Sequence, residues 1–302
     1  MFSSAHVPRI AITGGTGFVG RHLANRYPED RVVLASRRNG VDVTDIDSLT
    51  RAFEGCDVVA HFAGINREIG TQTFQRVHVE GTAAVIEAAQ RAGVRKVILL
   101  SFLRARPGTR SGYHQSKWEA EELIRASGLD YTILKAGMIY GRGDHLVDHL
   151  SRTVQTLPLF ASVGWHEKPI APIAVEELVD VAVAAIDGRL TRSTVAVRGG
   201  ETLMLSDAVR RVTATVGRRV WVIPAPIVFH YVLAQLAEWT MRVPLLAKAQ
   251  AMMLAEGVVD AAPPADELPD DLAPVGRFDT AAIRAALPDA GRFGFADLRG
   301  RG

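Results

Sequence analysis

The sequence predicts an α/β fold, in which a doubly wound parallel sheet is covered by helices on both faces and is followed by a smaller, mostly helical C-terminal region. Three observations predict it: short strands that are apolar throughout, helices between them, and a glycine-rich turn directly after the first strand. Strands without polar alternation are typical of a parallel sheet buried on both faces. With 302 residues, of which 48% are hydrophobic and 23% charged, the chain can bury a sizeable core, which argues against disorder and against a coiled-coil rod.

Strands and helices alternate over the first two-thirds of the chain. The expected strands are 9–13, 31–36, 57–62, 97–101, 131–134 and 194–197, and the expected helices are 20–27, 49–53, 74–92, 116–127 and 175–186. Beyond them, the pattern predicts a helix over 206–216 with Ser206 as its N-cap, a long apolar helix after Pro224, and a last helix over 280–286.

Composition and charge exclude several classes of protein. A net charge of +2 gives no indication of nucleic-acid binding. The single cysteine, Cys56, excludes an internal disulfide framework and a CxxC metal site, and His145 with His149 is better explained as a helix face than as a zinc site, so we expect no metal. The first residues lack a basic start and a long apolar run, so we expect no signal peptide and a cytoplasmic location.

A glycine-rich segment, Thr13 to Gly20, follows the first expected strand and precedes a helix. Its glycines fit both G-x-G-x-x-G and G-x-x-G-x-x-G. Glycine permits the tight turn and lets the backbone approach a pyrophosphate, whose charge the helix N-terminus attracts. The strand–loop–helix context predicts a Rossmann-type dinucleotide-binding fold.

The end of the second expected strand bears on which dinucleotide binds. An acidic residue there is typical of an NAD site, whereas arginine suits the 2′-phosphate of NADP. The strand ends in Ser36, Arg37 and Arg38, and the first acidic residue after it is Asp42. We therefore favour NADP, with NAD as the alternative.

A tyrosine and a lysine stand four residues apart downstream, as Tyr113 and Lys117. On a helix this spacing places both side chains on one face. A phenol with a pKa of about 10 is a poor acid or base at neutral pH, but an adjacent ammonium favours the phenolate. Lysine is scarce, with five in the chain, so this placement favours a chemical role, the transfer of a proton coupled to the transfer of a hydride.

These motifs in this order resemble the short-chain dehydrogenase/reductase superfamily, and most closely its extended and atypical branches, which include NAD-dependent epimerase/dehydratases, NmrA-like proteins and the complex I NDUFA-type subunit. The resemblance covers residues 9–200. It implies that Tyr113 is the catalytic acid/base and that Lys117 binds the nicotinamide ribose. The cofactor-binding positions that we expect from the motifs and the resemblance are Gly14, Thr16, Gly17, Phe18, Val19, Gly20, Arg37, Arg38, Asp42, Val43, Phe62, Ala63, Gly64 and Lys117.

Three positions depart from the family pattern. Ser101 stands where a Ser or Thr usually polarises the substrate carbonyl, but the next position, often a second Ser, is Phe102. His78 occupies a segment in which Asn is usual, and a histidine there could hydrogen-bond a water relay. Lys135-Ala136 replaces the usual Arg-Pro. These departures bear on turnover more than on cofactor binding.

We therefore expect an NAD(P)-dependent oxidoreductase or epimerase/dehydratase-like enzyme that acts on a small carbonyl or hydroxyl substrate, with Tyr113, Lys117 and Ser101 as catalytic residues. The alternative is a catalytically silent NADP(H)-binding sensor or assembly protein.

The expected domains are a cofactor-binding domain over 1–200, with 144–175 partly on the substrate side, and a substrate or partner region over 201–302. The apolar segment 227–246 leaves open a peripheral membrane or protein partner, a substrate lid or plain core packing, and a homodimer is also left open.

Overall fold

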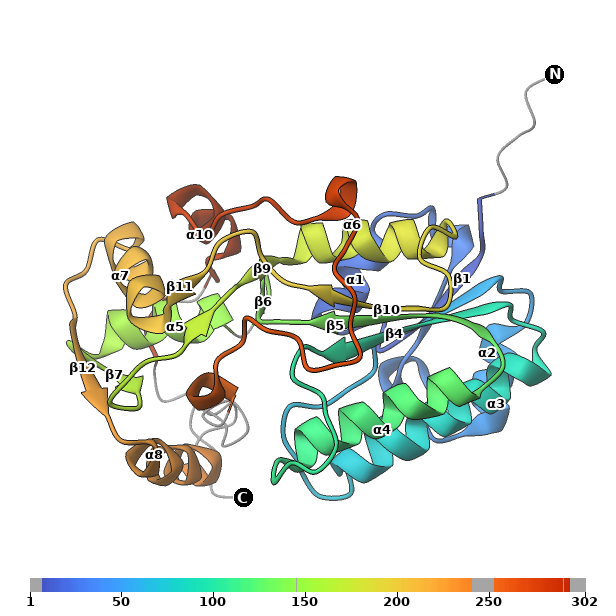
Figure 1. Ribbon diagram of the computed structural model, residues 1–302, viewed down its shortest axis with the longest axis horizontal. Coiled ribbons are helices and arrows are strands. Elements are labelled where there is room, and N and C mark those ends of the chain that lie inside the picture. Colours follow the sequence, from blue (N-terminus) through green and yellow to red (C-terminus); the bar gives the residue numbers. More distant parts are fainter. Residues whose placement is uncertain (1–6, 145, 241–252, 290, 294–302) are drawn as a thin grey trace. The chain divides into compact units, whose positions relative to one another are not determined.

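The structure is a computed structural model and describes residues 7–144, 146–240, 253–289 and 291–293. Its central sheet has six strands in the order β10-β5-β4-β3-β1-β2 (Figure 1). Their bounds are β1 Ile10–Thr13, β2 Val32–Ala35, β3 Val58–His61, β4 Lys96–Phe102, β5 Asp130–Ala136 and β10 Ser193–Val197. The pairs from β2 to β5 are parallel. The predicted α/β fold with a Rossmann-type sheet is confirmed.

Helices cover both faces of this sheet. In Figure 1, α2 (Ile46–Phe53), α3 (Gly81–Arg91) and α4 (Gly112–Ala126) lie on one face, and α1 (Phe18–Ala24) and α6 (Val175–Ile186) lie on the other. The core on the first face is built from small and branched apolar side chains, among them Val59, Val97 and Ile133, against Leu49 and Phe53 of α2. Three short helical turns interrupt the connections: η1 (Glu29–Arg31), η2 (Arg37–Asn39) and η3, a π-helical turn over Gln75–Glu80 that runs into α3.

The start of α4 matters for the site and lies four residues earlier than predicted. Ser111 is its N-cap and accepts a hydrogen bond from the backbone N–H of His114. Such a cap satisfies an amide that has no partner inside the helix. Both Tyr113 and Lys117 therefore lie within the helix, in its first two turns.

The chain divides into two compact units that alternate along the sequence. Unit 1 comprises residues 1–136, 178–196 and 262–272, and unit 2 comprises residues 137–177, 197–261 and 273–302. The grouping does not follow a single division at residue 200, because the chain enters unit 1 three times. The assignment of one part to the cofactor and the other to the substrate stays a prediction.

Unit 2 contains short strands that the sequence did not predict. The helices of unit 2 include α5 (Leu146–Thr156), α7 (Leu205–Thr215), α8 (Ile227–Thr240) and α10 (Thr280–Ala286). A short helical turn, η4 (Asp270–Leu272), belongs to unit 1. The strand pairs are β6 (Ile139–Tyr140) with β9 (Ile173–Ala174), β7 (Leu159–Val163) with β12 (Trp221–Ala225), and β8 (Pro169–Ile170) with β11 (Leu203–Met204). Unit 2 has its own apolar core, which includes Leu150, Val209 and Phe278.

The predicted N-cap of α7 is wrong. The helix begins at Leu205, directly after β11, so Met204 is at the N-cap and Ser206 lies inside the first turn. The pairing of β11 with β8 sets this start. The carboxylate of Glu167 accepts a hydrogen bond from the Ser206 N–H at 3.3 Å, which supplies the acceptor that a capping side chain would have provided.

The apolar segment predicted over 227–246 forms α8 up to Thr240, and residues 241–246 lie outside the described residues. Several of its side chains face solvent, with Val228 65% and Val232 56% exposed. Among the described helices, none combines the length and the apolar character needed to span a bilayer.

Candidate functional site

The strand order places the candidate site within unit 1. β2 and β3 lie on opposite sides of β1, so the connections after β1 and β3 run in opposite directions. In open α/β sheets a ligand binds outside the carboxyl ends of the strands at this switch in order. Here those ends carry Thr13 and His61, which are register partners, followed by the glycine loop and by Phe62-Ala63-Gly64.

Close backbone approaches explain the glycines of the loop. Gly14 has φ +69°, and a Cβ there would lie 2.8 Å from the Cα of Ala63. A Cβ on Gly20 would lie 2.5 Å from the carbonyl oxygen of Gly14. Both neighbours are backbone, so neither position accepts a side chain without moving the main chain. The loop is thus packed onto the connection after β3, which brings together two of the segments predicted to border the cofactor.

The remaining loop positions differ in what they present. Gly17 is the N-cap residue of α1 and contributes no side-chain cap to that helix. Thr16 and Phe18 are half-buried. Val19, by contrast, is buried and packs inward. At Val19, therefore, the backbone and not the side chain is available to a ligand.

Arg37 and Arg38 are exposed on η2, directly after β2. The Asp42 carboxylate accepts hydrogen bonds from the backbone N–H and the hydroxyl of Thr44, at 2.9 and 2.8 Å. The Thr44 hydrogen bonds and, to a smaller extent, the positive charges of Arg76 and Arg37 lower the pKa of Asp42. An ionised Asp42 with one oxygen held by Thr44 is thereby fixed at the end of this turn.

Lys117 reaches the carboxyl edge of the sheet. Its Nζ donates to the carbonyl oxygen of Leu100 at 3.0 Å, and a Cβ on Gly64 would lie 3.3 Å from Nζ. Burial lowers the pKa of Lys117 to about 8, an effect that the negative charge of Glu121 partly offsets. The structure therefore brings Lys117 together with the loop after β3, as predicted for two cofactor-binding segments.

Tyr113 is surrounded by aromatic rings. The ring centroids of Phe74, His78, Phe102 and His114 lie 5.4 to 6.0 Å from that of Tyr113. Within the part of the chain that the structure describes, no hydrogen bond is made by the Tyr113 hydroxyl. Burial raises the pKa of this phenol. The direction is opposite to the one expected from an adjacent ammonium, because the loss of solvent outweighs any effect of Lys117 in this state.

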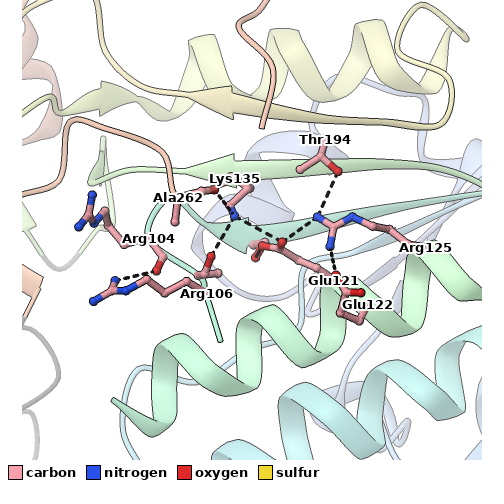
Figure 2. Close-up of polar contacts among 10 residues, drawn as sticks. Arg104, Arg106, Glu121, Glu122, Arg125, Lys135, Thr194 and Ala262 are labelled. Carbon is pink, nitrogen blue, oxygen red and sulfur yellow. Dashed lines mark hydrogen bonds and ion pairs between the residues drawn. The ribbon is translucent and has the colours of Figure 1, made fainter. Parts of the chain in front are cut away.

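Ser101 belongs to a different cluster. Its hydroxyl donates to the Glu121 carboxylate at 2.5 Å. Figure 2 shows Lys135 and Arg125 also pointing toward Glu121, with nitrogen–oxygen distances of 3.4 and 2.9 Å. Glu121 and Lys135 are fully buried. The prediction that Ser101 polarises a carbonyl beside Tyr113 is not supported by this arrangement, because Glu121 holds the Ser101 hydroxyl and Phe102 is the β4 residue whose ring contacts Tyr113.

Lys135 also binds two backbone segments, the loop after β4 and the segment that begins at Ala262. Its Nζ donates to the carbonyl oxygen of Ala105 at 3.0 Å and to that of Ala262 at 2.7 Å. The contact with Ala262 is visible in Figure 2. A buried ammonium with three oxygen acceptors is satisfied as a structural group. The lysine that replaces the usual arginine of the family thus anchors the loop after β4 rather than adding to the surface of the site.

Two buried histidines, His61 and His78, were not identified as site residues from the sequence. His61 is 1% exposed and His78 2%. The expectation of a water relay at His78 is wrong, because both of its ring nitrogens bond protein groups, Ser116 and the N–H of Ile65. For His61 the available signal was a histidine that closes the otherwise apolar strand Val58–His61, and for His78 it was the departure from the asparagine that is usual in the family.

Comparison with known proteins indicates the class of ligand that the fold binds. Residues 38–155 match a family model described as NAD(P)H-binding. The chain is 33% identical over 180 residues to a ceramide reductase of Caulobacter vibrioides, covering 54% of this chain and 53% of that protein, so the match spans about half of the relative's length. It is 32% identical over 152 residues to the uncharacterized sugar epimerase YhfK of Bacillus subtilis, covering 43% of this chain and 71% of that protein.

Among solved structures, a nucleoside-diphosphate-sugar epimerase of Staphylococcus aureus has the same fold, with a TM-score of 0.69 at 15% identity over 91% of this chain and 99% of that one. Taken with the glycine loop at the switch in strand order, these matches establish the family. The chain belongs to the NAD(P)H-binding proteins of the extended and atypical short-chain dehydrogenase/reductase type.

Proposed function

We propose that this protein is an NADP(H)-dependent oxidoreductase that reduces a small carbonyl compound or oxidises the corresponding alcohol, with Tyr113 as acid/base. The observation that carries the proposal is the placement of Lys117 Nζ beside Gly64, one helical turn after Tyr113, at the sheet edge where the NAD(P)H-binding fold holds its ligand. Reductases and epimerases among the relatives support the class of reaction.

The residues of the site fit a dinucleotide. A side chain at Gly14 would collide with the connection after β3, and a loop built from glycines exposes its backbone to the close approach of a pyrophosphate. Arg37 and Arg38, exposed after β2, would face the 2′-phosphate, and Lys117 would hold the nicotinamide ribose. When bound, the nicotinamide supplies or accepts the hydride.

In the reducing direction Tyr113 would donate its phenolic proton to the substrate oxygen while the hydride supplied by the bound nicotinamide adds to the carbonyl carbon. The Tyr113 O–H bond, the C–H bond of the hydride donor and the π bond of the carbonyl would break, and one C–H and one O–H bond of the alcohol would form. The raised pKa of the buried phenol keeps it protonated at neutral pH, as this direction requires. Lys117, with a pKa of about 8, is largely cationic at pH 7 and would stabilise the phenolate that remains.

Nucleotide choice is tested by titrating NADPH and NADH against the protein. Arg37→Asp should weaken NADPH binding about 10- to 100-fold, because a charge-assisted hydrogen bond is worth about 1.5–3 kcal/mol. Binding of NADH should change little. Arg51→Asp, an equal charge reversal at an exposed position of α2, serves as the control. Equal losses for both nucleotides, or equal losses in both variants, would disprove the assignment of the 2′-phosphate.

Turnover is tested with a panel of carbonyl substrates that includes keto-lipids and nucleotide-linked keto-sugars, monitored by NADPH oxidation. Tyr113→Phe should lower kcat at least 100-fold, because positioned proton transfer contributes about 10²–10⁴ to rate, and should leave NADPH affinity within about threefold. A rate that survives this substitution rules out Tyr113 as the acid/base.

A second candidate is a catalytically silent NADP(H)-binding sensor or assembly protein. The observation that favours it is at β4, where Phe102 packs on Tyr113 and Ser101 is held by Glu121, so neither supplies a hydroxyl beside the tyrosine. Saturable NADPH binding, no turnover over the substrate panel and nucleotide-dependent retention of a protein partner would support this second function.

A further inference from the structure

A buried chain of hydrogen bonds begins at the end of β1. The backbone N–H of Ala63 donates to Thr13 Oγ1 at 3.4 Å, and Thr13 Oγ1 lies 2.6 Å from His61 Nδ1. On the other side of the ring, His61 Nε2 lies 3.0 Å from Thr82 Oγ1, and that hydroxyl donates to the carbonyl oxygen of His78 at 2.5 Å. All three side chains are almost completely buried.

The direction of this chain fixes the tautomer of His61. A carbonyl oxygen only accepts, so the single hydroxyl proton of Thr82 goes to His78 O, and His61 Nε2 must be the donor to Thr82. His61 Nδ1 then accepts from the Thr13 hydroxyl. Burial lowers the pKa of His61 to about 3, and the ring is therefore neutral. The structure thus requires the Nε2–H tautomer at His61.

A second chain passes through the ring of His78. The backbone N–H of Ile65 donates to His78 Nε2 at 3.1 Å, and His78 Nδ1 lies 2.9 Å from Ser116 Oγ. Ser116 in turn donates to the carbonyl oxygen of Tyr113 at 3.1 Å. Because a backbone N–H can only donate, His78 Nε2 carries no proton and Nδ1–H donates to Ser116. His78 therefore has the opposite tautomer to His61.

The ring of His78 also contacts the reacting groups of the proposed site. Its centroid lies 5.7 Å from that of the Tyr113 ring, with the two rings at 76°, and it stacks on the Phe74 ring at a centroid distance of 5.5 Å. A Cβ placed on Gly64 would lie 3.5 Å from His78 Nε2 and 3.3 Å from Lys117 Nζ. His78 and Lys117 thus meet at the same point of the loop after β3.

We infer that His78 is a positioning residue, which uses its two ring nitrogens to tie the loop after β3 to the N-terminal part of α4 at Ser116 and so holds Tyr113 and Lys117 at the nucleotide. The inference rests on the proposed roles of Tyr113 and Lys117. With both nitrogens engaged, the ring cannot act as the proton carrier, and its contribution is geometric.

The contribution is tested first by the affinity for NADPH. Ser116→Ala removes the α4 partner of His78 and leaves the imidazole in place, and His78→Leu removes both links. Each should weaken NADPH about 5- to 20-fold, and the double variant should be no worse than His78→Leu alone, because the two residues act through one contact. His78→Asn, which keeps an N–H close to the place of Nδ1, should recover part of the affinity.

Ser48→Ala is the matched control. Ser48 is also a buried helical serine whose hydroxyl donates to the carbonyl three residues earlier, but it belongs to α2 and has no histidine partner. It should keep NADPH affinity within twofold. Equal losses in Ser48→Ala and Ser116→Ala, or additive losses in Ser116→Ala and His78→Leu, would overturn the inference.

Nitrogen-15 spectra of the histidine rings give a readout that does not depend on turnover. We expect His61 as the Nε2–H and His78 as the Nδ1–H tautomer, both neutral at pH 6, with assignment by the His61→Gln and His78→Asn variants. If the wild-type protein has no reductase activity, the proposed function is wrong. The spectra and the NADPH affinities still test the role of His78 in that case. An Nε2–H tautomer or a protonated ring at His78 would overturn the inference that His78 is a positioning residue.

Discussion

Lys117 is held in a place that favours its chemistry and disfavours the stability of the fold. Its ordinary pKa of 10.5 falls to about 8 on burial, a difference that corresponds to about 3 kcal/mol of unfavourable burial of the charge at pH 7. The hydrogen bond to Leu100 O offsets part of this unfavourable free energy when Lys117 is charged. Functional groups kept at such a cost are typical of active sites.

Lys117→Met should therefore raise the free energy of unfolding at pH 7 by about 1–2 kcal/mol and weaken NADPH binding. Urea unfolding followed by circular dichroism measures the first effect. Lys168→Met, at an exposed position, should stay within about 0.5 kcal/mol of the wild type. A destabilised Lys117→Met protein would show that the ammonium is compensated by contacts other than those described.

The buried histidines make stability depend on pH. Burial lowers the pKa of His61 to about 3, and that of His78 falls well below its ordinary value for the same reason, with Lys117 adding to both shifts. Above about pH 6.5 both rings are neutral in the folded and the unfolded chain. As the pH falls below that value the unfolded chain binds protons that the folded chain does not, so stability is lost.

At pH 5 the loss for His61 alone should be about 2 kcal/mol relative to pH 7.5. Urea unfolding at the two pH values measures it. His61→Gln should be less stable at pH 7.5 but should show a smaller decrease between the two values. An unchanged pH dependence in that variant would mean that His61 is protonated in the folded protein.

At the scale of the elements, the cluster around Glu121 connects α4 to β4 and β5. Removing one partner leaves the other charge buried, so Lys135→Met and Glu121→Leu should each cost about 3–5 kcal/mol. The double variant replaces the pair by apolar groups, and it should be less destabilised than the sum by at least about 1 kcal/mol.

A double-mutant cycle from urea unfolding measures this coupling. The exposed pair Glu87 and Arg91, four residues apart on α3, is the control, with an expected coupling of about 0.3–0.5 kcal/mol. A coupling of that small size between Glu121 and Lys135 would show that their contact contributes no more than a surface pair.

At the scale of the whole molecule, NADPH should stabilise the folded chain by about 2.7 kcal/mol at a concentration 100 times its Kd. Within unit 1, protection from amide hydrogen exchange should be greatest over 14–20, 62–65 and the first turn of α4. Residues 46–53 of α2 provide an internal reference. If the glycine loop is protected but the start of α4 is unchanged, the bound nucleotide does not contact the part of α4 that carries Tyr113.

The sheet, the glycine loop and the tyrosine–lysine spacing could be predicted because each depends on local pattern. Apolar strands such as Val58–His61 and a glycine turn carry their own signal. The start of α4 was placed too late, since Gly112 and Tyr113 are weak helix formers and the cap by Ser111 decides the boundary.

Long-range contacts could not be predicted in the same way. Ser101 bonds Glu121, twenty residues later, because the strand places its hydroxyl on that side of the sheet. The tautomers of His61 and His78 depend on hydroxyls from β1, α3 and α4. The short strands of unit 2 pair across intervals of up to about sixty residues, and two-residue strands carry no periodicity of their own.

Because residues 262–272 belong to unit 1, the nucleotide-binding unit cannot be expressed by truncating the chain at one position. Ala262 donates its N–H to Leu103 O, Asp266 exchanges backbone hydrogen bonds with β10 at Thr194 and Ala196, and Asp271 pairs with Arg189. A truncated clone that stops at residue 200 would leave the Lys135 ammonium without its Ala262 acceptor and the outer edge of β10 uncovered. Expression of the nucleotide-binding unit alone therefore calls for this peptide to be grafted back or supplied in trans, rather than for a stop codon after the last strand.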